Sequence, residues 1–443
     1  MPSTACSRSR AVIHLAAQVL LLTIVLFSPG ALRAQEASPE ATNPDVTVFD
    51  FTDLGSYGSA DGYASYAVGT RSCNRGSTPL NWCDQNNNGC AAGATPTDHP
   101  VIAQNLYRLK SGRFEQVGMS WLKHGFVSTN STTPGCTGAG GQTCTQPPEG
   151  GDQLGVGCTD PYQASLNSSR PLGRRSEVDA STGEFPLPNS PGGPYTVYDQ
   201  RIRVATSDMD AAQNPGALYF AEAQYVAPDD AIAGNGLNNA SYQRVTVGGP
   251  PGYSIGETGS FFEGSSAIEA WPAQDVLVER VNADVPGSVP LQRFQVARKV
   301  TNPSPGLWHY EYAIRNHNSD RAAQEFAIDF PDGTSITNAG FSDIDSHSGE
   351  PYSPTDWTIA VDAPTSVVSW TTETFATNPN ANALRWATMY NFWFDADSEL
   401  PLSHTLTLFK PGTPADVVFL AENAIFVDGF ESNSTTAWSA TVP

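Results

Sequence analysis

In the stretch LWHYEYAIRN, residues 307–316, apolar and polar side chains alternate. Apolar side chains occupy every second position in it: Trp308, Tyr310, Tyr312 and Ile314. Successive side chains of a strand point to opposite faces of the sheet. This alternation therefore predicts an antiparallel strand with one face in a core and the other face polar.

The sequence on both sides of this stretch repeats the pattern. EFAIDFP places Phe326, Ile328 and Phe330 at alternate positions, and LRWATMYNFWF alternates in the same way. With RFQVARKV, TSVVSW and HTLTLF, residues 290–410 contain about six strands at the spacing of a β-sandwich.

The N-terminal half carries similar signals between longer loops. NLYRLKSGRFEQV is typical of a hairpin that turns at Lys110, Ser111 and Gly112, and YTVYDQRIRVAT, ALYFAEAQYVA and YQRVTVG follow as strands. The chain has 39 glycines and 34 prolines but only 15% charged residues, which disfavours long helices.

We therefore predict an all-β protein of two antiparallel β-sandwich-like units with long disulfide-stapled loops. The predicted parts are an N-terminal cysteine-containing domain, a C-terminal sandwich, and a final strand with a polar tail: residues 45–285, 286–411 and 412–443.

Residues 1–34 have the layout of a secretory signal peptide. Arg8 and Arg10 precede the apolar run AVIHLAAQVLLLTIVLF, and small residues follow up to Ala34, near which we expect cleavage. No other segment approaches the roughly 20 apolar residues that span a bilayer. We expect a secreted or cell-surface protein with no transmembrane anchor after cleavage.

The formal net charge is −22, and cleavage would remove three arginines and no acidic residue. A chain this acidic repels phosphate backbones and anionic membranes. Nucleic acid is therefore excluded as a partner, whereas an acid-rich exterior suits calcium ions.

Six cysteines remain after the predicted cleavage: Cys73, Cys83, Cys90, Cys136, Cys144 and Cys158. An even number of cysteines in an exported chain predicts a disulfide framework, here of three bonds whose connectivity the sequence leaves open. The chain has no C-x-x-C pair, which disfavours the alternative of a zinc site.

Six phrases carry a resemblance to known proteins: HPVIAQNLYRL, RFEQVGMSWLKHGF, LGVGCTDPY, DDAIAGNGLNNASY, WHYEYAIRNHNSDR and HSGEPYSPTDW. Together they resemble a family of large, uncharacterised secreted proteins of environmental bacteria, over most of residues 45–410. That family brings no catalytic residues with it. The tail IFVDGFESNSTTAW is similar to a short sorting-like segment at the C-terminus of exported bacterial proteins, and this resemblance implies a sorting or surface role.

GFSDIDSHSGEPY, residues 340–352, holds the densest set of reactive side chains. Asp343, Asp345 and His347 lie at alternate positions, and Glu350 follows. On a strand the three would share a face, at the carboxyl spacing used in glycoside hydrolysis. In a loop they would converge on a metal ion, either calcium or, through the imidazole, a transition metal. A solvated polar turn is the third interpretation.

DQNNNG, residues 84–89, matches the first half of a calcium-binding loop. Its oxygen side chains alternate at Asp84, Asn86 and Asn88 before a glycine. The twelfth position is Thr95 in place of the bidentate glutamate, so an ordinary EF-hand is disfavoured and an asparagine-rich turn remains the alternative.

Two other patterns are weaker. GYSIG fits the G-x-S-x-G motif at Ser254, but two prolines precede it and no helical pattern follows it. His99, Met119 and His124 are residue types that bind copper, although their spacing does not support a shared site.

The sequence thus predicts an exported, non-enzymatic β-sandwich protein, stabilised by disulfides and calcium, for surface display or for binding an extracellular ligand or glycan. The alternative is an extracellular, metal-dependent, hydrolase-like enzyme centred on Asp343, Asp345 and His347.

Overall fold

The computed structural model describes residues 43–83, 90, 94–95, 97–168, 172–186, 198, 200–271, 276–284 and 288–420. The chain is 46% strand and 8% helix, and every strand pairing is antiparallel. The predicted all-β class and the predicted scarcity of helix are therefore confirmed. Among the described residues, no helix is long and apolar enough to cross a membrane.

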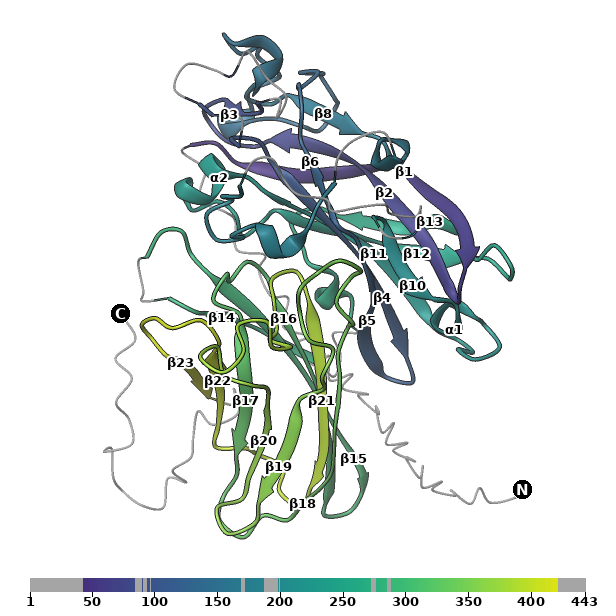
Figure 1. Cartoon of the computed structure of the whole chain (residues 1–443), viewed down its shortest axis with the longest axis vertical. Coiled ribbons are helices and arrows are strands. Elements are labelled where there is room, and N and C mark those ends of the chain that lie inside the picture. Colours follow the sequence, from purple (N-terminus) through teal and green to yellow (C-terminus); the bar gives the residue numbers. More distant parts are fainter. Residues whose placement is uncertain are drawn as a thin grey trace, which may run out of the picture. The chain divides into compact units, whose positions relative to one another are not determined.

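The N-terminal part of the chain forms one eleven-stranded sheet (Figure 1). Its main path runs, in spatial order, through β1 (Val46–Ala60), β2 (Tyr63–Asn74), β10 (Ile202–Ala205), β5 (Arg113–Met119), β4 (Val101–Lys110), β11 (Leu218–Val226), β12 (Ala240–Val247) and β13 (Ile255–Phe262). Three short strands complete it: β6 (Leu122–His124), β8 (Thr159–Tyr162) and β9 (Leu172–Gly173).

This sheet curls over on itself. Strand β1 stands first in the strand order, yet it lies against β11, β12 and β13 at the other end of that order. The enclosed core includes Val46, Tyr66, Leu106, Ala221 and Val245, all buried. A single curled sheet therefore gives the sandwich-like packing that the sequence predicted.

Short elements fill the connections of the N-terminal part. They are a strand pair, β3 (Leu80–Asn81) with β7 (Gln153–Leu154), two short α-helices, α1 (Thr206–Met209) and α2 (Pro228–Ala233), and five 3-10 turns, η1 (Ala139–Gly141), η2 (Gly150–Asp152), η3 (Ala164–Ser168), η4 (Arg175–Glu177) and η5 (Ala267–Ala270).

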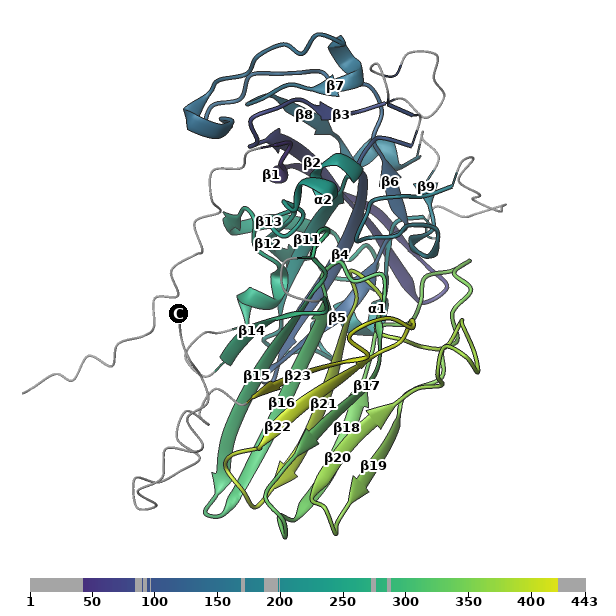
Figure 2. The same ribbon diagram turned by 90° about the vertical axis from the view of Figure 1, so that its left-hand side faces the viewer.

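The C-terminal part contains two five-stranded sheets (Figure 2). The first has the order β14 (Val276–Asn282), β15 (Arg293–Ser304), β16 (Leu307–Asn316), β21 (Met389–Ala396) and β18 (Ile336–Ser342). The second has the order β19 (Thr358–Asp362), β20 (Val367–Thr371), β17 (Ala323–Asp329), β22 (Ser403–Leu408) and β23 (Asp416–Leu420). Because β14 and β23 belong to these sheets, the sheets extend beyond both predicted boundaries at 285/286 and 411/412.

The two five-stranded sheets share an aromatic core. Tyr312 of β16 and Phe392 of β21 meet Phe326 of β17, and Trp370 of β20 packs against the same ring. The period-two pattern of LWHYEYAIRN predicted this arrangement, since burying one face of each strand builds the interior of a sandwich.

Strands β4 and β11 meet β16 through a group of buried polar side chains that we call the buried joint: Asn105, Tyr107, Glu222, Gln224 and Arg315. Arg315 Nη2 lies 2.9 Å from Glu222 Oε1, and both side chains are fully buried. Arg315 Nη2 also donates to Gln224 Oε1 at 2.6 Å. The Tyr107 hydroxyl and the Asn105 amide donate to Glu222 Oε1 at 2.9 and 3.0 Å.

Two disulfides staple the loop-rich region. Cys73 at the end of β2 is bonded to Cys136, and Cys144 is bonded to Cys158. Cys83 and Cys90 take part in neither bond, and the third disulfide stays a prediction. The intervening residues Asp84 to Gly89, with the proposed calcium ligands Asp84, Asn86 and Asn88, lie outside the described residues.

Candidate ligand-binding site

The segment after β18 does not form the site that its sequence suggested. His347 is 3% exposed, and its Nε2 donates to the backbone oxygen of Arg201 at 2.9 Å. Burial disfavours the imidazolium form and lowers the pKa of His347 to about 4. This histidine is a neutral structural group whose ring ties the segment to Arg201, the residue that precedes β10.

The neighbouring acidic side chains point to different partners. Asp343 accepts a hydrogen bond from the Asn382 amide, and burial raises the Asp343 pKa to about 6. Glu350 accepts the backbone N–H groups of Arg175 and Ser176 at 2.7 and 3.2 Å, and so caps η4. Asp345 is exposed.

Asp343, Asp345, His347 and Glu350 therefore do not share a metal site, which corrects the expectation from the sequence. In the described parts of the chain, no group of three or more His, Cys, Asp or Glu side chains could hold a metal ion. Residues 343–350 form a loop, and its side chains dock on separate elements.

A small cavity borders this loop. It is lined by Met119, Arg175, His347, Glu350 and Tyr352, among others, and its volume is about 20 Å³. One water-sized probe needs roughly 10–15 Å³. The cavity is therefore too small for a metabolite.

The structure also shows where the two weaker sequence patterns lie. Ser254 lies in the turn between antiparallel β12 and β13, which is not the strand-to-helix elbow that a nucleophilic serine requires. His99 and His124 are brought together, with His99 Nε2 2.9 Å from His124 Nδ1, and the Phe185 ring packs against both imidazoles. This buried pair is part of the core.

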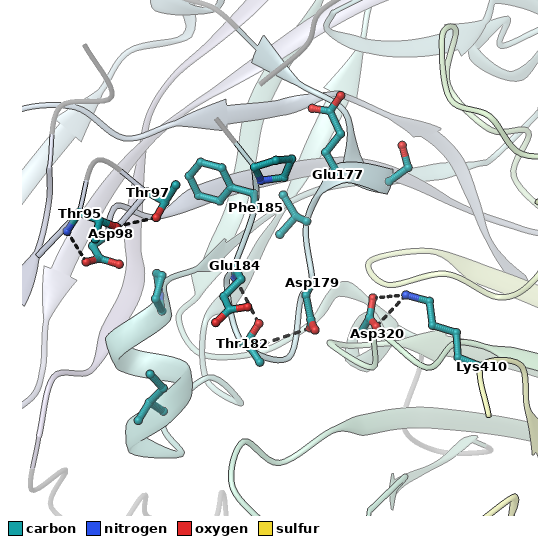
Figure 3. A pocket seen from close by; sticks show the side chains of 15 residues that line it. Thr95, Thr97, Asp98, Glu177, Asp179, Thr182, Glu184, Phe185, Asp320 and Lys410 are labelled. Atoms are coloured by element: carbon teal, nitrogen blue, oxygen red, sulfur yellow. Dashed lines mark hydrogen bonds and ion pairs between the residues drawn. The ribbon is translucent and has the colours of Figure 1, made fainter. Parts of the chain in front are cut away.

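A much larger cavity, about 700 Å³, opens beside the turn that follows η4 (Figure 3). We call it the acidic cavity because its charged lining is five carboxylates and one ammonium group: Asp98, Glu177, Asp179, Glu184, Asp320 and Lys410. Ligand sites commonly have volumes of roughly 300–1,000 Å³. The acidic cavity is thus large enough for a small extracellular ligand.

The turn at Asp179 to Glu184 forms one wall of the acidic cavity. Asp179 Oδ1 accepts hydrogen bonds from the Ser181 backbone N–H at 2.8 Å and from the Ser181 hydroxyl at 2.7 Å. Gly183 has φ +75°, and a Cβ there would lie 2.7 Å from the Pro228 nitrogen at the start of α2. Only glycine lets this turn pack so closely against the helix.

Other carboxylates of the acidic cavity also hold local structure. Asp98 Oδ2 accepts the Thr95 backbone N–H at 2.7 Å, and Lys410 Nζ pairs with both oxygens of Asp320 at 2.7 Å (Figure 3). Glu184 is exposed beside them. Apolar surface is present too, since Ile232 of α2 lines the cavity and is 67% exposed.

Sequence reasoning missed the acidic cavity because four separate segments supply its charged residues. The one local signal is DASTGE, residues 179–184, whose aspartate, serine and glycine are typical of a tight turn. A turn signal alone does not indicate which other carboxylates will lie beside it.

Comparisons with known proteins leave the family of the chain open. No protein family and no curated protein match the sequence. One solved structure with some similarity is the N-terminal domain of the Streptococcus gordonii adhesin Sgo0707, with 8% identity, coverage of 78% of this chain and 58% of that chain, and a TM-score of 0.16. This chain thus matches less than two thirds of that domain, and so low a TM-score carries no argument.

Proposed function

We propose that the protein is an exported, non-enzymatic β protein that binds a neutral or positively charged, hydroxyl-rich ligand, such as a glycan, in the acidic cavity. The observation that carries the proposal is a cavity of about 700 Å³ with five carboxylates against one lysine. Carboxylates accept hydrogen bonds from sugar hydroxyls and bind ammonium groups, whereas they repel anionic ligands.

The contacts within the lining support binding over catalysis. Asp98, Asp179 and Asp320 are each engaged by a backbone N–H, a serine or a lysine. Groups engaged in this way give a preformed wall, which lowers the entropy cost of ordering the site around a ligand. The exposed side chains of Glu184 and Ile232 are then the groups with most freedom to meet that ligand.

The test is a binding screen of the mature protein against neutral, amino-containing and acidic oligosaccharides, followed by calorimetry on those that bind. Neutral or amino-containing sugars should bind, and acidic sugars should not. Glu184→Lys should weaken binding by at least about tenfold, because it reverses one charge in the site.

Glu399→Lys is the matched control, because Glu399 is also exposed and does not line the acidic cavity. It should leave the affinity close to that of the unaltered protein. Equal affinities for both variants and the unaltered protein would place the ligand elsewhere. Preferential binding of acidic sugars would contradict the proposed chemistry.

A further inference from the structure

A second group of oxygen-bearing side chains lies where β1 begins, at the loop between α2 and β12. Asp230 of α2 is fully buried, and Asp45 and Asn239 are 2% and 1% exposed. The backbone N–H of Val46 donates to Asp230 Oδ1 at 2.9 Å, which holds the α2 carboxylate against the first residue of β1. We call Asp45, Asp230, Asn238 and Asn239 the α2 oxygen cluster.

Each carboxylate of the α2 oxygen cluster faces an asparagine amide. Asn239 Nδ2 donates to Asp230 Oδ2 at 2.8 Å, and Asn238 Nδ2 lies 3.1 and 3.3 Å from the two oxygens of Asp45. Within the described structure, the Oδ1 atoms of both asparagines are buried and have no hydrogen-bond partner. A buried amide oxygen without a partner is costly.

Little positive charge faces the two carboxylates of the cluster. Both carboxylates are removed from water, since Asp230 is fully buried and Asp45 is 2% exposed. The cation that acts on Asp45 is Arg75, whose guanidinium is already paired with Glu263 at 2.7 Å. Two buried carboxylates beside two amides are therefore short of positive charge.

The loop between α2 and β12 packs closely around these groups. A Cβ added to Gly236 would lie 3.5 Å from Asp230 Oδ2 and 3.8 Å from Asn239 Nδ2, so the glycine backbone runs directly past the cluster. The Asn235 amide donates to the Pro44 carbonyl at 2.7 Å and fastens the same loop to the residues before β1. Rotating the Asn238 or Asn239 amide by half a turn would present oxygen where nitrogen now lies, without moving the backbone.

We propose that the α2 oxygen cluster is a calcium site, with Asp45 and Asp230 as carboxylate ligands and Asn238 and Asn239 as amide ligands. Two bidentate carboxylates and two amide oxygens would supply roughly the lower limit of the six to eight oxygens that calcium takes. The cluster has only two acidic side chains and so differs from a group of three or more metal-binding residues. The inference does not depend on the ligand proposed for the acidic cavity.

The experiment uses the mature protein treated with a chelator and then titrated with calcium chloride. Calorimetry should show one bound calcium ion, and Tm should rise by on the order of 3 °C, because calcium binds the folded state selectively. Magnesium at the same concentration should give a smaller rise, since it keeps its water ligands and demands a tighter geometry. The absence of both binding heat and a Tm rise with calcium would overturn the proposal.

Variants locate the site. Asp45→Asn combined with Asp230→Asn should abolish the calcium-dependent rise and leave the chelated protein equally stable or more stable, because two buried charges are removed. Asp343→Asn combined with Asp345→Asn is the matched control, and it should keep the full rise. A full rise in the first double variant, or its loss in the control, would overturn the assignment.

A milder variant covers the case in which the first double variant does not fold. Asn238→Ala removes one amide ligand at a partly exposed position, and it should raise the Kd for calcium at least about fivefold. An unchanged Kd in this variant would contradict the ligand set.

Discussion

His347 shows how a residue that is typical of metal sites can serve as a structural tie. Its ring donates to Arg201, and the next residue, Ser348, accepts the Trp121 indole N–H at 2.9 Å. Both contacts join the loop after β18 to the N-terminal sheet. The neutral imidazole is the form that fits this buried position.

We predict that His347 makes the protein sensitive to mild acid. Its folded pKa of about 4 lies below its ordinary value near 6.5, so its contribution to stability is fully present above about pH 6.5 and is lost as pH falls toward 4. His347→Gln keeps a donor for the Arg201 carbonyl. Between pH 7.5 and 5 this variant should lose about 2 kcal/mol less than the unaltered protein in urea denaturation.

His309→Gln gives a control of opposite sign. Burial favours the neutral form of His309, but its hydrogen bonds with Asp395 and Glu311 outweigh burial and raise its pKa. Its contribution is present below about pH 6.5 and is lost as pH rises. The same acid sensitivity in the His347 and His309 variants would show that His347 is not the cause.

At the scale of the residue, the sequence identified polar side chains but not their partners. Asp343 and His347 lie four positions apart, yet one faces Asn382 and the other faces Arg201. Those partners are separated from them by 39 and 146 positions along the chain. No local spacing contains that information, because the partners depend on how the sheets pack.

Among the strands, the alternation of apolar and polar residues in LWHYEYAIRN correctly predicted which face of β16 is buried in the sandwich. Tyr310, Tyr312 and Ile314 of β16 are buried in the sandwich core, as their positions predicted. The polar face was less predictable, since Arg315 at the end of the same strand is fully buried against Glu222. A period-two pattern identifies the face that enters the strand's own core, but it does not reveal that a second sheet covers part of the other face.

We predict that the disulfides contribute unequally. Cys73 and Cys136 are 63 positions apart, whereas Cys144 and Cys158 are 14 apart. Closing a longer loop restricts the unfolded chain more, so replacing the first pair by serine should cost about 4 kcal/mol, and replacing the second about 3 kcal/mol. Guanidinium denaturation of the two double-serine variants measures both losses. A larger loss for the short loop would mean that local packing, and not chain entropy, dominates.

At the scale of the whole molecule, the buried joint connects the curled sheet with the sandwich. We predict that Glu222→Gln costs about 3–5 kcal/mol, because it leaves the Arg315 guanidinium buried without its counter-charge. In calorimetry the unaltered protein should unfold in one transition, and the variant should show two as the sheet systems uncouple.

Asp50→Asn is the control for that experiment, because Asp50 pairs with Arg71 on the surface of the curled sheet, where both side chains are about one third exposed. It should cost less than about 1 kcal/mol and keep the single transition. A loss in Glu222→Gln no larger than in this control would show that the joint does not hold the sheet systems together.

The sequence predicted the class of the molecule but not this joint. Glu222 and Arg315 are separated by 93 positions. Neither strand has a sequence pattern that indicates a partner in the other sheet. A lone glutamate in ALYFAEAQYVA and a lone arginine in LWHYEYAIRN indicate only that something must compensate a charge in an apolar setting.

Strand β19 has a consequence for how the protein behaves in concentrated solution. It is an end strand of its sheet, and all five of its residues, including Ile359 and Val361, are exposed in the described structure. A bare strand edge is a template for pairing between molecules. The formal charge of −22 keeps molecules apart at low ionic strength, whereas at about 1 M salt the screening length falls to about 3 Å. Crowded, salty surroundings should therefore favour edge-to-edge aggregation of this protein, and dilute buffers should keep it dispersed.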